Sequence, residues 1–218
     1  MGQALINING DGAQTLEILM LMTTVSLLPS ILIMMTSFTR IIIILSFLRN
    51  AMGVQQLPPN MVLIGISIFL TLFIMSPVID DINQNAYTPY TSQQITQEQA
   101  IERAQVPLRE FMLRQTETGT LNMYAEFAGQ ELSENVSEIP MKIVVPAFMT
   151  TELKRAFVIG FLLFIPFMLI DLIVASTLMS MGMMMLPPAM ISLPFKILLF
   201  ITIDGWNLLF STIIKGFN

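Results

Sequence analysis

Four charged side chains lie inside otherwise apolar stretches of this 218-residue chain: Arg40, Asp171, Lys196 and Asp204. The chain has no histidine and no cysteine, which removes imidazole acid–base catalysis, thiol nucleophiles, disulfides and His or Cys metal sites. The sequence shows neither a catalytic constellation nor a nucleotide-binding glycine-rich loop. We therefore predict a protein that is not an enzyme and that uses no cofactor or metal.

The buried charges need partners. Each would cost about 2.5–3.5 kcal/mol at the centre of a membrane, so such residues usually pair or face a polar cavity. Asp171 and Lys196 lie on either side of one Pro-Pro turn. Both can therefore lie at a similar depth in the membrane. We predict that they pair and support folding or assembly. The alternative, a side chain that snorkels to the headgroups, suits Arg49 better and also fits Asp204.

The composition is that of an integral membrane protein. Hydrophobic residues make up 54% of the chain and charged residues 11%, against about 25% charged in soluble domains. With ten basic residues and a net charge of −5, the chain is not expected to bind nucleic acid. A span needs about 20 apolar residues and must satisfy its own backbone, which favours helices. Four long apolar blocks fit: Leu16–Leu48, Met61–Ile79, Ala156–Met179 and Ile191–Ile214.

The charges divide the chain into regions, since 17 of the 25 lie between Asp80 and Arg155. We expect an all-α, membrane-associated fold with an N-terminal tail over 1–15, a first hydrophobic hairpin over 16–81, a polar helical insert over 82–153 and a second hairpin over 154–218. Basic residues near the short loops place these loops in the cytoplasm. The insert and both termini are then periplasmic, which a removed signal peptide would explain.

Within the insert we expect a loop over Tyr87–Thr96 and a helix that starts with a Thr96–Gln99 capping box. Pro107 is expected to kink or divide this helix, and a second helix is expected over Leu121–Leu132. Pro140 and Pro146 bound a short apolar segment, with Thr150 or Thr151 as the N-cap of the third block.

Two aromatic residues of the insert, Phe111 and Tyr124, have two interpretations. They either pack inside the insert or form contacts between subunits, since so small a region buries little on its own.

A motif occurs twice. Met52–Met61 and Met181–Met190 both fit M-G-x-x-x-L-P-P-x-M, 129 residues apart. Glycine ends a helix and proline can start the next, so we predict two related hairpins with their turns on the same side. Only the second turn is rich in methionine, with six in the twelve residues from Met179. Methionine side chains are flexible and fill irregular gaps. Such a turn could form a deformable constriction in a ring of subunits, or be buried against lipid or a partner.

Several motifs run through the chain: Ser37–Arg40, Phe47–Gly53, Leu57–Pro59, Val145–Phe148, Glu152–Leu153, Ala156–Phe157, Ile159–Phe161, Pro166–Phe167, Asp171, the methionine-rich turn and Pro194–Lys196. At these residues the sequence resembles the FliP/SctR family of type III export-gate subunits. The resemblance covers nearly the whole chain, apart from about the first fifteen residues and parts of the insert.

The resemblance implies a pore-forming subunit of the flagellar type III export gate in the bacterial inner membrane, at the flagellar basal body. Five copies would form a ring with FliQ and FliR, next to FlhB and FlhA, around a closed channel for unfolded flagellar proteins. The family's methionine gasket falls on Met183, Met184 and Met185, and its subunit contacts on Phe111, Tyr124 and Glu152. Its hairpins form a conical stack largely above the bilayer plane.

Two other functions remain open from the residues alone. Repeated hairpins and broken helices near intramembrane charges are also found in secondary transporters. A purely structural membrane scaffold is the other alternative.

Overall fold

A computed structural model describes residues 12–54, 57–130, 139–183 and 185–217. In this part of the chain the prediction of an all-α fold is confirmed, because there are helices and no strands. They are α1 (Gly12–Met34), α2 (Phe38–Met52), α3 (Asn60–Ile82), the π-helix η1 (Asn83–Tyr87), α4 (Thr88–Thr91), α5 (Gln97–Gln115), α6 (Thr118–Phe127), α7 (Met141–Ser180), α8 (Pro188–Thr202) and α9 (Gly205–Lys215).

Within the residues that the structure describes, two continuous helical stretches are long and apolar enough to cross a membrane, Asn60–Thr91 and Met141–Ser180. The pair α8–α9 is a third candidate, bent by 62° at the short break between the two helices. The number of hairpins and their position relative to the bilayer stay predictions.

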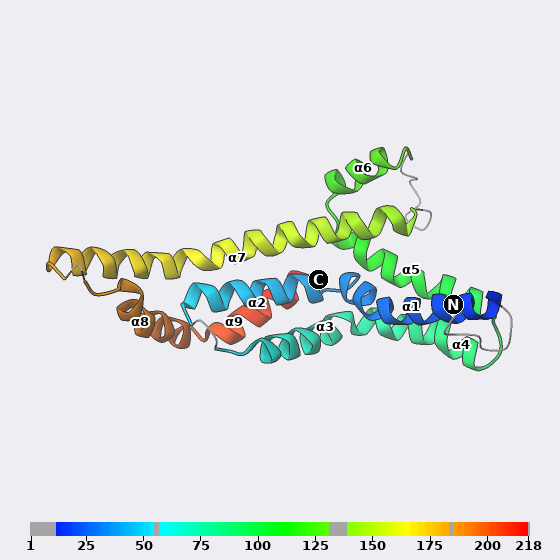
Figure 1. Ribbon diagram of the computed structural model, residues 1–218, viewed down its shortest axis with the longest axis horizontal. Coiled ribbons are helices and arrows are strands. Elements are labelled where there is room, and N and C mark those ends of the chain that lie inside the picture. Colours follow the sequence, from blue (N-terminus) through cyan, green and yellow to red (C-terminus); the bar gives the residue numbers. More distant parts are fainter. Residues whose placement is uncertain (1–11, 55–56, 131–138, 184, 218) are drawn as a thin grey trace, which may run out of the picture.

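The 40-residue helix α7 runs along the long axis of the molecule and organises the fold (Figure 1). Helix α2 packs along its middle, α5 and α6 pack on its N-terminal part, and α8 folds back against its C-terminal part. Helices α2 and α7 point in the same direction, so the turns that follow them lie toward the same end of the molecule (Figure 1).

The contact between α2 and α7 is the centre of the core. On α2, Ile41, Ile44, Leu45 and Leu48 form one stripe at helical spacing, and none is more than 1% exposed. On α7, Gly160 faces the ring of Phe47, and a Cβ at this position would lie 2.5 Å from that ring. The absence of a side chain at Gly160 therefore sets how closely the two helices approach.

Prolines end fewer helices than the sequence predicted. The segment between Pro140 and Pro146 is not separate from the third block, because α7 starts at Met141 and continues through Pro146 and Pro166. Thr151 is accordingly not an N-cap: its hydroxyl donates to the carbonyl of Ala147 in mid-helix. A proline removes one backbone hydrogen bond, and the packing of a long apolar helix against its neighbours offsets that loss.

The insert shows the same pattern. Pro107 lies inside a continuous α5 and does not divide it. The loop expected from Tyr87 is wrong in its first half, because η1 and α4 extend α3 as far as Thr91. The capping box of Thr96 and Gln99 is confirmed by reciprocal hydrogen bonds.

Three further block boundaries differ from those predicted. The first block, predicted over Leu16–Leu48, is interrupted between α1 and α2, after Met34. The fourth block is bent between Thr202 and Gly205, where Asp204 has a φ of +51°. The second helix of the insert ends at Phe127, and the predicted end at Leu132 lies outside the described residues.

Candidate functional site

The methionine-rich turn between α7 and α8 lies at the far end of the molecule, beyond the end of α2 (Figure 1). Its described methionines face outward: Met181 is 68% exposed, Met183 42% and Met185 98%. Met184 lies outside the described residues. In a single chain the turn therefore presents flexible apolar side chains at the surface of the described structure.

The two copies of the repeat have the same start. Gly53 after α2 and Gly182 after α7 both have a φ of +77°, a left-handed conformation that favours glycine. The next helices then begin after Pro59 and Pro187, respectively. The sequence repeat is thus a structural repeat at the point where each chain reversal starts.

We call residues 172–195 the arm: the end of α7, the methionine-rich turn and the start of α8. The arm has no charged residue. Apolar side chains from both helices line a groove between them, among them Ile173, Leu178 and Ile191. The hydroxyls of Ser176, Thr177 and Ser180 donate to carbonyls of their own helix. The outer surface of the arm therefore offers almost no free polar group.

A charge cluster fixes the base of the arm. Lys196 of α8 lies 2.6 Å from Asp171 of α7, so the predicted pair is present. Ser192 donates to the other oxygen of Asp171 at 2.6 Å, and Lys196 also donates to the carbonyl of Ala51 at 3.2 Å. Lys196 is 5% exposed, whereas the side chain of Asp171 is 41% exposed. This base cluster joins α7 and α8 to the C-terminal end of α2.

The arm extends well past this anchor. Nine residues separate Asp171 from Ser180, the last residue of α7, and an α-helix rises about 1.5 Å per residue. The turn therefore lies on the order of 14 Å beyond the base cluster.

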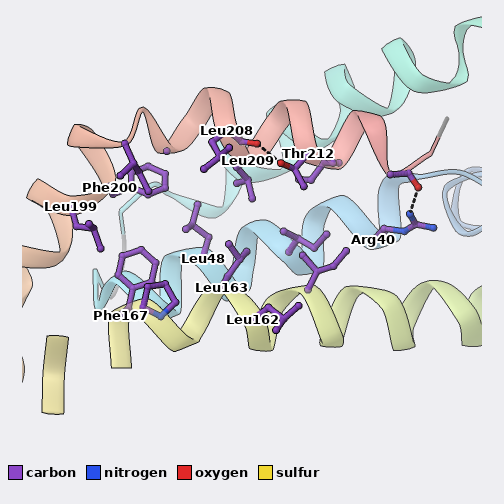
Figure 2. A pocket seen from close by; sticks show the side chains of 17 residues that line it. Arg40, Leu48, Leu162, Leu163, Phe167, Leu199, Phe200, Leu208, Leu209 and Thr212 are labelled. Atoms are coloured by element: carbon purple, nitrogen blue, oxygen red, sulfur yellow. Dashed lines mark hydrogen bonds between the residues drawn. The ribbon is translucent and has the colours of Figure 1, made fainter. Parts of the chain in front are cut away.

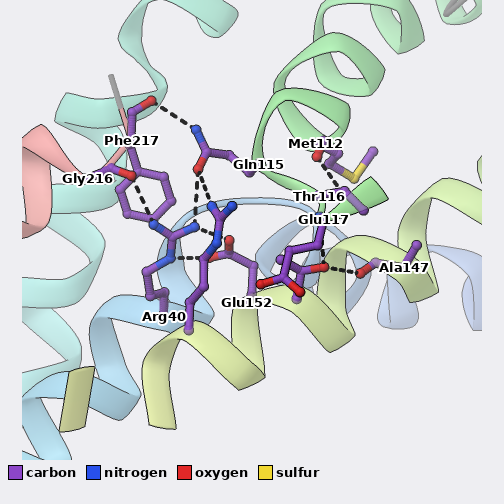
Figure 3. Close-up of polar contacts among 11 residues, drawn as sticks. Arg40, Met112, Gln115, Thr116, Glu117, Ala147, Glu152, Gly216 and Phe217 are labelled. Carbon is purple, nitrogen blue, oxygen red and sulfur yellow. Dashed lines mark hydrogen bonds and ion pairs between the residues drawn. The ribbon is translucent and has the colours of Figure 1, made fainter. Parts of the chain in front are cut away.

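A second cluster surrounds Arg40, which is 3% exposed (Figure 3). Its guanidinium forms a bidentate pair with Glu152 of α7, with Nε donating to Oε2 at 2.8 Å. It also donates to the side chain of Gln115 at 3.2 Å and to the carbonyl of Gly216 at 3.1 Å. The ring of Phe217 lies 3.8 Å from the guanidinium carbon. This Arg40 cluster ties α2, α5, α7 and the residues after α9 together.

The charges that the sequence assigned to interfaces have local partners. Arg49 donates to the carbonyl of Pro58 at 3.4 Å and to the side chain of Asn60, which clamps the first turn. Asp204 is exposed at the bend between α8 and α9 and accepts a hydrogen bond from Asn207 at 2.7 Å.

The residues assigned to subunit contacts differ in their surroundings. Phe111 is 4% exposed between the rings of Phe148 and Phe217, and Glu152 is fully buried. Tyr124 is half-buried, with its hydroxyl 3.0 Å from that of Thr150. Since Phe111 and Glu152 lie inside this chain, they can affect a neighbouring subunit only through the helices that they hold in place.

Three partners in these clusters were not identified from the sequence: Gln115, Ser192 and Phe217. Each is an uncharged residue whose role depends on a partner from another helix. Gln115 ends α5, and its amide donates to the carbonyl of Phe217 at 3.0 Å across 102 residues. No local pattern predicts such a contact.

Comparison with known proteins shows to which of them this sequence is similar. The FliP family model matches residues 21–213. The flagellar biosynthetic protein FliP of Pectobacterium carotovorum subsp. carotovorum is 52% identical over 211 residues, which are 96% of this chain and 82% of that protein. The FliP protein of Bacillus subtilis is 49% identical over 205 residues, which are 94% of this chain and 93% of that protein. The FliP protein of Caulobacter vibrioides is 48% identical over an alignment of 223 residues, which covers 100% of this chain and 84% of that protein.

Proposed function

The chain belongs to the FliP family, and we propose that it is a pore-forming subunit of the flagellar type III protein export gate. In this function, copies of the chain surround a channel through which unfolded flagellar proteins cross the bacterial inner membrane. The complex would contain five copies with FliQ and FliR, and would adjoin FlhB and FlhA. The insert and both termini would face the periplasm.

The observation that carries the proposal is the uncharged arm with its methionine-rich turn. The arm extends past its last anchor and exposes Met181, Met183 and Met185. In a ring, the turns of neighbouring subunits would meet around an axis. A constriction lined by apolar side chains excludes water by dewetting, and it blocks ions because they would lose their hydration there.

Methionine suits a gate that must open for many different chains. Its unbranched side chain adapts to irregular surfaces, and contacts with it require no particular sequence in the substrate. We propose that Met183, Met184 and Met185 form this deformable gasket. The base cluster would hold each arm at a fixed angle, so that the turns meet at the same height.

A secondary transporter remains the alternative, with a structural scaffold as a third function. A transporter needs polar groups that are free to bind a substrate. The two buried basic side chains of the described apolar helices are instead bound by carboxylates of the same chain: Arg40 pairs with the buried Glu152, and Lys196 with the partly exposed Asp171. This arrangement favours the gate.

The test is a leak measurement. Met183, Met184 and Met185 are changed together to alanine, and ion or small-molecule leakage is measured across membranes that contain the assembled complex. The control changes three exposed methionines far from the turn, Met61, Met123 and Met168. We expect leakage to rise only in the first variant. An unchanged leak in an assembled complex would refute the gasket.

The assembly itself gives a separate test. The mass and symmetry of the detergent-purified complex distinguish a five-fold ring with accessory subunits from a monomer or two-fold dimer. The latter outcome would favour a transporter.

A further inference from the structure

Helix α9 lies over the contact between α2 and α7, with an apolar cavity of about 350 Å³ beneath it (Figure 2). Its buried side is one stripe at helical spacing: Gly205, Leu209 and Ile213. All three line the cavity, together with Ile44 and Leu48 of α2. Side chains that face a void lose the dispersion contacts that a packed neighbour would supply. The inner face of α9 is therefore held less tightly than that of a fully packed helix.

The connection between α8 and α9 has the features of a hinge. Helix α8 ends at Thr202, α9 begins at Gly205, and the two are bent by 62°. Asp204, between them, has a φ of +51°, in the left-handed region that few residues other than glycine adopt. Gly205 lies so close to the ring of Phe200 that a Cβ would be 2.3 Å from it, so the start of α9 is seated on α8. Hinges are usually a few residues at the ends of elements that absorb a change in φ and ψ.

The far end of α9 is fastened by the two residues that follow it (Figure 3). The carbonyl of Gly216 accepts a hydrogen bond from Arg40 at 3.1 Å, and that of Phe217 accepts one from Gln115 at 3.0 Å. The ring of Phe217 lies 3.8 Å from the guanidinium carbon of Arg40 and stacks on Phe111 at 6.3 Å. Carbonyls at the end of a helix have no partners within it, and α2 and α5 supply partners here. We call Gly216 and Phe217, with these contacts, the latch.

The latch can open without breaking the core of the Arg40 cluster. Nη1 of Arg40 binds the latch, whereas Nε and Nη2 bind Glu152 and Gln115. With the latch open, the guanidinium therefore keeps its buried counter-ion, and the large cost of an unpaired buried charge does not arise. Gly216 is exposed, so its released carbonyl can be hydrated. Moving α2 away from α7, by contrast, would separate Arg40 from Glu152.

We propose that α9 is a hinged lid, which opens and closes as one unit about residues 202–205 and is held shut by the latch. The closed lid covers Ile44 and Leu48 and completes the partners of Arg40. Because Gln115 ends α5, the latch also links the lid to the insert. A movement of α5 that draws Gln115 away loosens the lid, and an open lid loosens the end of α5 in return. The lid is a property of the single chain and does not depend on the gate function.

Hydrogen–deuterium exchange of the full chain in detergent, measured by mass spectrometry, tests the lid. Amides of a unit that opens by itself exchange through that opening, whereas amides of the stable core exchange only through global unfolding. We expect residues 208–213 of α9 to exchange as one group, at least about tenfold faster than residues 41–48 of α2. Exchange of α9 that is no faster than that of α2 overturns the lid. This comparison uses the wild-type chain, so it does not depend on how a variant folds.

The latch is tested with Phe217→Ala, with Phe217→Tyr as the variant that keeps the ring. The matched control is Phe127→Ala, since Phe127 is 77% exposed at the end of α6. Without the ring over Arg40, α9 should exchange about tenfold faster, while residues 41–48 of α2 stay unchanged. The end of α5, residues 112–115, should also exchange faster. Phe217→Tyr and Phe127→Ala should behave as the wild type.

Two outcomes in Phe217→Ala contradict the latch. Unchanged exchange of α9 shows that the ring does not hold the lid. An equal rise in α9 and α2 shows that Phe217 stabilises the whole fold and not the lid. Unchanged exchange at the end of α5 overturns the link between the lid and the insert.

Discussion

The Arg40 cluster provides a quantitative test of what holds the fold together. Glu152 is fully buried and Arg40 is 3% exposed, so each charge depends on the other. Removing one partner of a buried pair costs about 3–5 kcal/mol, because the remaining charge stays buried. We expect Glu152→Leu to lie near the lower end of this range, because Arg40 still donates to Gln115 and to the carbonyl of Gly216.

The reverse change should cost more. Arg40→Met leaves the fully buried carboxylate of Glu152 without both of its hydrogen bonds from Arg40, and an unsatisfied buried group costs about 1–3 kcal/mol, or more when it is charged. The double variant Arg40→Met with Glu152→Leu removes both charges. It should be less destabilised than the sum of the single variants by at least about 2 kcal/mol, since replacing both members of a buried pair is often close to neutral.

The assay is a double-mutant cycle on the free energy of unfolding, followed by the fluorescence of Trp206, the single tryptophan of the chain. The matched control is the cycle for Glu117 and Lys154, a pair with an exposed lysine. Solvent screens that pair, so its coupling should be clearly smaller. If the two single changes at Arg40 and Glu152 simply add, the cluster does not act as a unit and the reasoning fails.

Three further predictions concern other parts of the chain. Asp171→Asn weakens the base cluster, so export should fall while the helical content by circular dichroism is kept; normal export would count against a role in holding the arm. Gly160→Ala forces a Cβ against the ring of Phe47 and should cost about 1–3 kcal/mol of unfolding free energy, a cost that should disappear when the same change is made in a Phe47→Ala background. The hydrogen bond from its lysine partner lowers the pKa of Glu117 below the ordinary value of 4.5. The Glu117–Lys154 pair therefore stabilises the folded state fully above pH 4.5, and this contribution is lost as the pH falls further. The melting temperature should fall with it, and Glu117→Gln should reduce this pH dependence.

Composition and charge predicted much of the architecture, because a bilayer leaves few alternatives to helices for long apolar segments. The position of the methionine-rich turn followed from a local motif. The pairing of Asp171 with Lys196 followed from two charges on either side of one turn. These features depend on short stretches of sequence or on neighbouring segments.

Other features depend on contacts that no local pattern records. Arg40 and Glu152 lie 112 residues apart, and the local sequence around Glu152 predicted only the start of a helix, with Thr150 or Thr151 as its N-cap. Pro146 was misleading for a related reason. It lies inside α7, where packing against other helices offsets a missing hydrogen bond. Local propensity alone would have ended the helix.

The repeat shows how one sequence motif gives two turns with different surroundings. Both turns begin with a glycine at the same φ, but the helices before them differ in length, 15 residues in α2 and 40 in α7. The first turn therefore ends beside α8, where Gly53 lies close to Leu193 and Lys196. The second turn continues past that point and is exposed. Since the backbone conformation at the glycine is shared, the length of α7 and the methionines of the second turn are what distinguish it. The gate that we propose at the second turn depends on that difference in reach as much as on the residue type.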